Sequence, residues 1–325
     1  MVDLKNINFK NNNLNSIKGD ASFRNFYRKK SKIGTSIIVY SKKEKKKNLL
    51  NYTAINKILL KKKISAPKLL SQNYKNNYIE IEDLGKITLY KILNRKNKKK
   101  IFNKVLKILI KLQKIRLKKI RNFDSKYYKI PIYSKKILFE ESNLFLKWYL
   151  PSIHKGKKKL KINKDLTKII KKLIKKLKFP NDTFVHRDFH VSNLMMNKNK
   201  ISIIDSQDAV YGNIAYDLAS LIDDVRIKTS KKFKRFIYNN YFDFNKKKLN
   251  RGHFTNDFLI LSVLRNLKII GIFTRLSLRD KKDQYLKLIP HAWKLIQSRI
   301  NNNIIFKDLK NNLDKNFSKR LRLKK

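Results

Sequence analysis

The chain of 325 residues contains no cysteine. A disulfide framework and a thiolate metal site are therefore excluded, and the chain is compatible with a reducing compartment. Long apolar runs are lacking as well: the first residues, MVDLKNINFKNNNLNS, hold no apolar stretch of signal-peptide length, and the most apolar later segment, 258–276, is broken by Arg265, Asn266, Lys268 and Arg275. The sequence predicts neither a secretion signal nor a membrane span, and we expect a cytoplasmic location.

Acidic residues are scarce too. The chain has 23 Asp and Glu against 81 Lys and Arg, which gives a formal net charge of +58. Such a field attracts nucleic acid or anionic lipid at low salt. The lysines are dispersed in short runs along the whole chain together with many Ile and Asn, which favours an AT-rich genome over a nucleic-acid site, and no recognised nucleic-acid motif accompanies them. We expect no membrane partner and no specific nucleic-acid partner, although non-specific nucleic-acid binding is compatible with the charge.

Apolar periodicity predicts a small, strand-rich first part and a larger helical part. In the first 85 residues, strands are expected at 22–28, 36–40 and 78–83, with a helix over 45–63 and a turn at Leu84-Gly85. Helices are expected in six later segments: 98–120, 134–149, 162–178, 214–242, 255–277 and 281–298. The predicted domains are a nucleotide-binding lobe (1–85), a catalytic and substrate lobe (86–310) and a frayed basic tail (311–325).

One patch between the helices has a different pattern. The short apolar runs 183–186, 194–196 and 201–204 read as strands, and polar loops separate them. These loops carry the segments VHRDFHVSN (185–193) and IIDSQD (203–208), and Asp205 of the second lies twelve residues after Asn193 of the first.

The loop residues suit phosphoryl transfer from ATP, which needs the phosphates held on Mg²⁺ and the acceptor hydroxyl oriented. Asp188 is expected to accept or orient the proton of that hydroxyl. Asn193 and Asp205 are expected to bind Mg²⁺, because hard oxygen ligands are those that Mg²⁺ prefers. Each residue alone reads as a turn residue, but four polar positions and two strands have to agree in this pattern, which makes it specific.

The segment His186 to Asn193 resembles the aminoglycoside phosphotransferase branch of the kinase superfamily. Protein kinases usually carry Lys two places after the catalytic Asp, whereas this branch carries His, as His190 does here. An A-P-E signature is missing, so a protein kinase is the weaker alternative. The resemblance implies an α+β, two-lobed protein-kinase-like fold with a small β-rich N-lobe and a large helical C-lobe, and ATP and Mg²⁺ as cofactors.

Within that branch the chain resembles the bacterial anomeric kinases that phosphorylate N-acetylmuramate and N-acetylglucosamine at C1 during cell-wall recycling. Four stretches carry the resemblance: GDASFR (19–24) with 26–28, WYL (148–150), DSQDAV (205–210) with Gly212 and 216–218, and RNLKIIGIF (265–273) with 279–280. The resemblance implies phosphorylation of the anomeric hydroxyl of such a sugar. A kinase of another small alcohol, such as choline or an aminoglycoside, is the first alternative, and a non-catalytic nucleic-acid-binding protein on a kinase scaffold is the second.

The resemblance also implies roles for further residues. The loop with Gly19, Ser22 and Arg24 is expected to contact ATP phosphates, unless it is only a tight turn, and Glu82 and Asp83 are expected near the adenine. The usual lysine of the third strand is not obvious, which leaves the phosphate contacts of the small lobe open. The residues expected to bind the substrate, or to support those that do, are His190, Gln207, Asp208, Arg265 and Lys268. His186 and Asp217 are expected to support the catalytic loop.

Arg265 and Lys268 lie three residues apart on one predicted helical face. They form either a positive wall for the carboxylate of a lactyl-bearing sugar or part of a core helix whose charged ends reach solvent.

Overall fold

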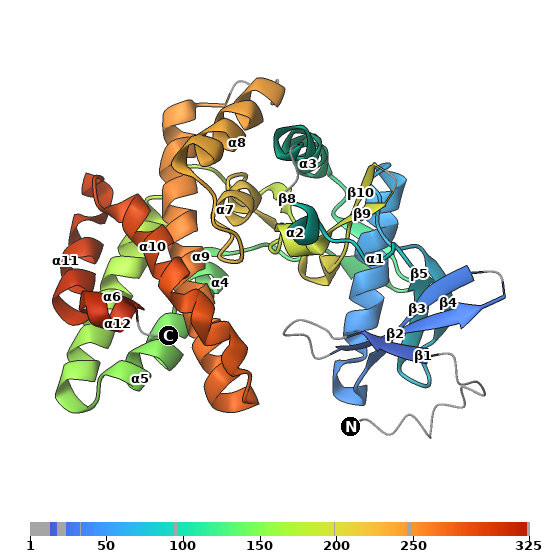
Figure 1. Ribbon diagram of the computed structural model, residues 1–325, viewed down its shortest axis with the longest axis horizontal. Coiled ribbons are helices and arrows are strands. Elements are labelled where there is room, and N and C mark those ends of the chain that lie inside the picture. Colours follow the sequence, from blue (N-terminus) through green and yellow to red (C-terminus); the bar gives the residue numbers. More distant parts are fainter. Residues whose placement is uncertain are drawn as a thin grey trace. The chain divides into compact units, whose positions relative to one another are not determined.

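The structure is a computed structural model that describes residues 14–17, 24–32, 34–93, 97–197, 199–245 and 249–323. The chain forms two compact units, which are labelled in Figure 1 by their helices and strands. The first unit comprises residues 1–130 and 191–209, and the second comprises 131–190 and 210–325. A boundary between compact units need not coincide with a boundary between functional lobes, so the lobe boundary at residue 85 stays a prediction.

The first unit is built on a five-stranded antiparallel sheet with the order β1-β2-β3-β5-β4. Its strands are β1 (Leu14–Ile17), β2 (Arg24–Ser31), β3 (Gly34–Ser41), β4 (Leu69–Asn73) and β5 (Tyr78–Glu82). Helix α1 (Lys47–Lys61) packs on this sheet (Figure 1), where its Leu49 and Tyr52 join a core with Ile37, Val39 and Ile81. Three of the strands and the helix follow the predicted pattern. The edge strands β1 and β4 lack a buried alternating pattern and were not predicted.

The remaining elements of the first unit are short, apart from one helix. They are α2 (Leu89–Ile92), α3 (Lys98–Gln113), the hairpin of β6 (Lys119–Arg121) and β7 (Tyr127–Lys129), and the hairpin of β9 (Leu194–Asn197) and β10 (Lys200–Ile203). The prediction of a helix up to residue 120 is wrong at its end. Helix α3 stops at Gln113, and Ile120 is buried from a strand instead.

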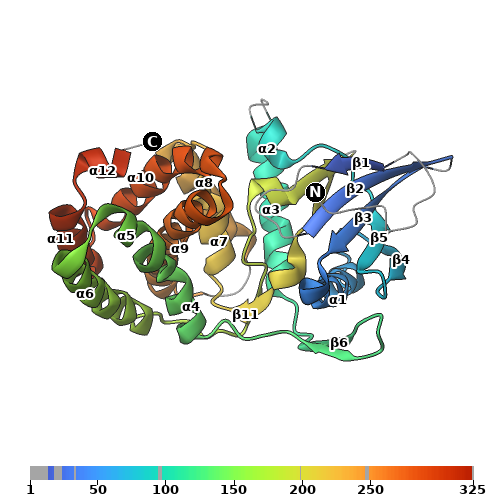
Figure 2. The same ribbon diagram turned by 90° about the horizontal axis from the view of Figure 1, so that it is seen from below.

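The second unit is mostly helical, with one small sheet. Its elements are α4 (Lys135–Ser142), a π-helix (Phe145–Tyr149), α5 (Leu150–Ile153), α6 (Gly156–Lys175), β8 (Thr183–Val185), β11 (Val210–Gly212), α7 (Tyr216–Ile222), α8 (Lys231–Phe244), α9 (Arg251–Asp280), α10 (Ile289–Ile300), α11 (Lys307–Asn316) and α12 (Lys319–Leu323). Helix α9 contacts the π-helix as well as α4, α7 and α10, and the last three are seen around it in Figure 2. Its Gly271 allows a close approach, since a Cβ there would lie 2.3 Å from the carbonyl carbon of Leu144.

Two predictions for this unit are wrong. The single helix expected over 214–242 is two helices, α7 and α8, because the chain turns at Asp223. That residue has the non-helical dihedral angles φ −107° and ψ 41°, and its buried carboxylate binds Arg299 Nε at 2.8 Å and Lys234 Nζ at 2.7 Å. The frayed tail expected from residue 311 is helical in its described part, where Leu313 and Phe317 are fully buried.

A search of the described helices for one long and apolar enough to cross a membrane finds none.

Candidate active site

The segment with the proposed base, Asp188, lies in the second unit directly after strand β8. Strand β8 pairs with β11, with Val185 opposite Val210, and the chain then turns through Arg187, which has the left-handed φ of 73°. Asp217 of α7 holds this turn, because its carboxylate accepts hydrogen bonds from the backbone nitrogens of His186 at 2.7 Å and Arg187 at 3.1 Å. Burial raises the pKa of Asp217 to about 7 in spite of these bonds.

Asp188 is half-buried and surrounded by positive charge. Burial alone would raise its pKa, but the charges of Lys268, Arg265 and Arg187 outweigh burial and hold the pKa of Asp188 below its ordinary value of 3.8. Asp188 is therefore a carboxylate at neutral pH, which is the state that a proton acceptor needs.

Glu141, which was not predicted as a site residue, connects the cations around Asp188. It accepts hydrogen bonds from the Tyr133 hydroxyl and from Arg187 Nη2, and it binds Lys268 Nζ at 2.8 Å. Burial opposes its ionisation, but Lys268 and Arg187 lower the pKa of Glu141 below its ordinary value. Glu141 lies 47 residues before Asp188 in an ordinary amphipathic helix, so no spacing in the sequence links it to the motif.

The side chain of His190 is buried in the same unit. Burial and the positive charge of Arg226 lower the pKa of His190 to about 3, so its imidazole is neutral at neutral pH. Asp224, a second residue that was not predicted, is also buried and accepts the backbone N–H of Arg226 at 3.0 Å. Burial opposes ionisation of Asp224, but Arg226 and His190 lower its pKa. His190, Asp224 and Arg265 thus influence one another electrostatically next to Asp188.

The predicted metal ligands lie in the first unit, at the two ends of the β9–β10 hairpin. Asn193 precedes β9, and its carbonyl oxygen accepts the N–H of Ile204 at 3.0 Å. Asp205 follows β10 in the left-handed conformation, with a φ of 65°. The next residue, Ser206, donates its hydroxyl to Asn56 Oδ1 of α1 at 2.6 Å, which attaches this segment to the helix.

Arg24, the first residue of β2, forms an ion pair with Asp205. Its guanidinium lies over the rings of Phe26 and Tyr52, at 5.3 Å and 5.0 Å from the ring centroids. The Arg24 side chain is only 2% exposed, whereas that of Asp205 is 38% exposed. The structure therefore places Arg24 beside a predicted metal ligand, and its contact with phosphate stays a prediction. Gly19 and Ser22 lie outside the described residues.

Asp83 stabilises the turn after β5, and Glu82 contacts the residue that precedes β4. Asp83 accepts bonds from Arg28 Nε at 2.6 Å and from the Gly85 nitrogen at 2.9 Å, and Arg28 also binds the Gly85 carbonyl at 3.0 Å. Burial opposes ionisation of Asp83, but the bond from Arg28 lowers its pKa. Glu82 accepts the backbone N–H of Lys68 at 3.3 Å.

Gln207 and Asp208 follow Asp205 in a short 3-10 turn (Ser206–Asp208). Gln207 is buried and donates to Asp208 Oδ2 at 3.0 Å, and Asp208 is exposed.

The residues present fit a magnesium ion that is shared with phosphates. Among the described residues, no group of three or more His, Cys, Asp or Glu could enclose a metal ion. Magnesium rarely needs such an enclosure, because it is commonly bound by one or two protein oxygens together with substrate phosphates and water. The accessible carboxylate of Asp205 and the amide oxygen of Asn193 are donors of that kind.

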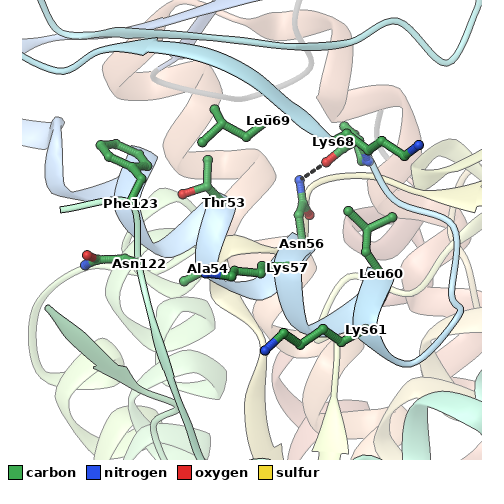
Figure 3. A pocket seen from close by; sticks show the side chains of 11 residues that line it. Thr53, Ala54, Asn56, Lys57, Leu60, Lys61, Lys68, Leu69, Asn122 and Phe123 are labelled. Carbon is green, nitrogen blue, oxygen red and sulfur yellow. Dashed lines mark hydrogen bonds between the residues drawn. The ribbon is translucent and has the colours of Figure 1, made fainter. Parts of the chain in front are cut away.

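A cavity of about 450 Å³ lies elsewhere in the first unit (Figure 3). Its wall includes Leu60, Leu69 and Phe123, and Asn56 reaches from α1 to the Pro67 carbonyl at 3.2 Å. None of the predicted site residues lines it. We therefore do not assign the cavity to the reaction.

Comparison with known proteins identifies the family of the chain. Residues 13–248 match the model of the phosphotransferase enzyme family. The chain belongs to this family. It is 28% identical over 283 residues to an N-acetylmuramate/N-acetylglucosamine kinase of Neisseria meningitidis serogroup B, covering 83% of this chain and 80% of that protein. A kinase of the same name from Pseudomonas aeruginosa is 27% identical over 293 residues, covering 86% of this chain and 82% of the relative.

The solved structure of an amicoumacin kinase with AMP-PNP and Ca²⁺ has the same fold, with a TM-score of 0.62 at 12% identity over 89% of this chain and 90% of that one. The predicted kinase-like α+β fold and the predicted phosphotransferase class are confirmed.

Proposed function

We propose that this phosphotransferase transfers the γ-phosphoryl group of ATP to the C1 hydroxyl of N-acetylmuramate, N-acetylglucosamine or both. The observation that carries the proposal is the ionised Asp188 in the segment His186 to Asn193, surrounded by arginine and lysine. The names of the related proteins supply the substrate class. We place the reaction in the cytoplasm, where ATP is abundant.

In this proposal Asp188 is the proton acceptor. Its carboxylate orients the anomeric hydroxyl and takes its proton as the oxygen attacks the γ-phosphorus, while the bond from that phosphorus to the β,γ-bridging oxygen breaks and ADP leaves. An anomeric hydroxyl is more acidic than an ordinary alcohol, so modest assistance suffices. Most of the acceleration then comes from positioning and from charge stabilisation.

Asn193 and Asp205 would hold Mg²⁺, which when bound neutralises phosphate charge and orients the γ-phosphoryl group. The ion pair between Arg24 and Asp205 supports this assignment, because it orients the carboxylate while leaving part of it exposed. Arg24 would then contact phosphate when ATP is bound. Glu82 and Asp83 would shape the turn next to the adenine, which backbone groups would recognise.

The charges around Asp188 favour an anionic or neutral acceptor over a cationic one. Arg187, Arg265 and Lys268 all act on Asp188, and like charges placed together are unfavourable in a poorly solvated site. Arg265 is buried in α9 and would face the lactyl carboxylate of N-acetylmuramate. A kinase of choline or an aminoglycoside would need acidic groups in that place, so it is the weaker candidate.

The test is ATP turnover with N-acetylmuramate, N-acetylglucosamine, other hexoses, choline and an aminoglycoside. We expect turnover with the amino sugars and an acid-labile C1 phosphate as product, and loss of turnover in Asp188→Ala and Asp205→Asn. Asp243→Ala, at an exposed position of α8, is the matched control and should keep full activity. Turnover with choline or the aminoglycoside alone would refute the proposed substrate.

A further inference from the structure

We propose that Glu141 is a positioning residue, which holds Arg187 and Lys268 in place beside the catalytic segment. This inference deepens the proposed function, since it rests on the role given there to Asp188. Glu141 itself is expected to touch neither ATP nor the acceptor.

The geometry of Glu141 joins three segments that are far apart in the sequence. Glu141 belongs to α4, Arg187 to the loop after β8, and Lys268 to α9. The side chains of Glu141, Arg187 and Lys268 are only 14%, 21% and 13% exposed. Water therefore stabilises their charges little. An ion pair of this kind is sensitive to the loss of one partner, because the other charge is left buried and uncompensated.

A second support reaches the same loop through Tyr133. Its hydroxyl donates to Glu141 and lies 3.1 Å from the hydroxyl of Tyr216, and its ring lies 5.1 Å below the guanidinium of Arg187. Tyr216 is followed by Asp217, which binds the backbone nitrogens of His186 and Arg187. Backbone bonds and side-chain bonds therefore converge on the residue that precedes Asp188.

Arg187 needs such support because of its backbone. A non-glycine residue with a φ of 73° is in a sparsely populated conformation that persists only where the surroundings enforce it. The Glu141 carboxylate fixes the end of this side chain while Asp217 fixes its backbone.

Glu141 also sets the electrostatics of the site. Burial would lower the pKa of Lys268, but Tyr216, Glu141 and Asp188 together raise it, so Lys268 stays charged. Without the Glu141 charge, Lys268 and Arg187 would repel each other more strongly, because they would lose one of the two carboxylates that compensate them. We expect both side chains to withdraw toward solvent, and Asp188 would lose its oriented neighbours.

The first test is Glu141→Gln, which keeps the shape of the side chain and removes its charge. We expect kcat to fall about 10- to 100-fold, and the KM for ATP to stay within about twofold, because the residues assigned to ATP belong to the other unit. Glu140→Gln makes the same change at the adjacent, exposed position and should match the wild type. Circular dichroism and the urea midpoint would show whether each variant is folded.

The second test asks whether Glu141 acts through Lys268. If it does, the effects of Glu141→Gln and Lys268→Met on kcat are not multiplicative, and the double variant is little worse than Lys268→Met alone. Their effects on the urea midpoint should likewise be less than additive, a readout that needs no activity. Tyr133→Phe, which removes one donor to Glu141, should lower kcat by a smaller factor than Glu141→Gln.

The outcomes separate this inference from the proposed function. Normal kcat in Glu141→Gln, or a loss of kcat that multiplies with that of Lys268→Met, would overturn the positioning role while amino-sugar turnover by the wild type upheld the function. Wild-type turnover on choline alone would overturn the function, and the same variants measured with choline would still decide the role of Glu141. A rise in the KM for ATP with unchanged kcat in Glu141→Gln would also contradict the positioning role of Glu141.

Discussion

The two segments that carry the motif are held in opposite ways. In the second unit, Asp188 is half-buried among several cations, and Asp217 and Glu141 hold the residues just before it in the loop. In the first unit, the carboxylate of Asp205 is partly exposed and forms an ion pair with Arg24. A proton acceptor works only at a fixed distance from its hydroxyl, whereas a metal ligand must stay accessible to an ion and to phosphates that come and go.

The two segments nevertheless share one backbone feature. Arg187, just before Asp188, and Asp205 itself are both non-glycine residues in the left-handed conformation. Such residues are uncommon and cluster at functional sites. The comparison predicts that changes near Asp188 (the catalytic segment) lower kcat, because orientation is lost. Changes near Asp205 (the metal segment) should instead raise the concentration of Mg²⁺ or ATP that half-maximal activity requires.

The largest effect should come from exchanging the carboxylate for an amide in both segments. Asp188→Asn removes the proton acceptor and should lower kcat by about 10²- to 10⁴-fold at every Mg²⁺ concentration. Asp205→Asn keeps an oxygen donor, so part of its lost activity should return as Mg²⁺ is raised. Initial rates over a Mg²⁺ series would measure both, with Asp243→Asn as control. If added Mg²⁺ restored the activity of Asp188→Asn as well, the proposed difference between the two segments would be wrong.

The next effect concerns the helix that presents Lys268. Gly271 lies one turn after Lys268, and an added Cβ there would overlap the backbone of Leu144 and Phe145. Gly271→Ala should therefore lower the free energy of unfolding by about 2 to 3 kcal/mol and lower kcat as well. Gly252→Ala, near the start of the same helix, meets only an Asn250 side-chain atom at 3.4 Å and should be nearly neutral. Urea unfolding would compare the two variants. Equal losses of stability would contradict the close approach of α9 to Leu144 at Gly271.

A smaller effect is expected at the metal segment. Arg24→Gln removes the cation paired with Asp205 and, in our proposal, a phosphate contact. The KM for ATP should rise about tenfold, the equivalent of one interaction of about 1.4 kcal/mol, with kcat changed less. Arg235→Gln, exposed on α8, is the control. A loss confined to kcat would mean that this segment is held as tightly as the catalytic one.

Residues that belong to the local motif can be predicted from the sequence better than residues that reach the site from a distant part of the chain. Asp188, Asn193 and Asp205 follow from local spacing, because each stands where a short apolar strand begins or ends. Glu141 carries no such signal, since its partners Arg187 and Lys268 are 46 and 127 residues away and its helix has an ordinary amphipathic pattern. Asp224 lies in the turn after α7, and the residue that brings it to the site, His190, is 34 residues before it. Edge strands β1 and β4, and the break after α7, depend on tertiary contacts and were missed for the same reason.

The smallest expected effect is a change in how stability depends on pH. The folded pKa of Asp217 is raised to about 7 from 3.8, so the folded state holds this proton longer than the unfolded state. Asp217 therefore makes the free energy of unfolding fall as pH rises between about 4 and 7. His190 acts in the opposite sense, because its folded pKa of about 3 is below the ordinary 6.5, and its contribution rises with pH over that range.

In Asp217→Asn, the contribution of His190 to the pH dependence of the free energy of unfolding should no longer be offset by that of Asp217. The variant should be less stable overall, since an amide replaces one of the two acceptor oxygens that bind backbone N–H groups. Its free energy of unfolding should also rise more steeply with pH between about 4.5 and 6.5 than that of the wild type. Urea unfolding at three pH values measures the slope, with Asp243→Asn as control. An unchanged slope would mean that Asp217 is ionised in the folded protein, so that its two backbone hydrogen bonds outweigh burial and the catalytic loop is held by a full charge.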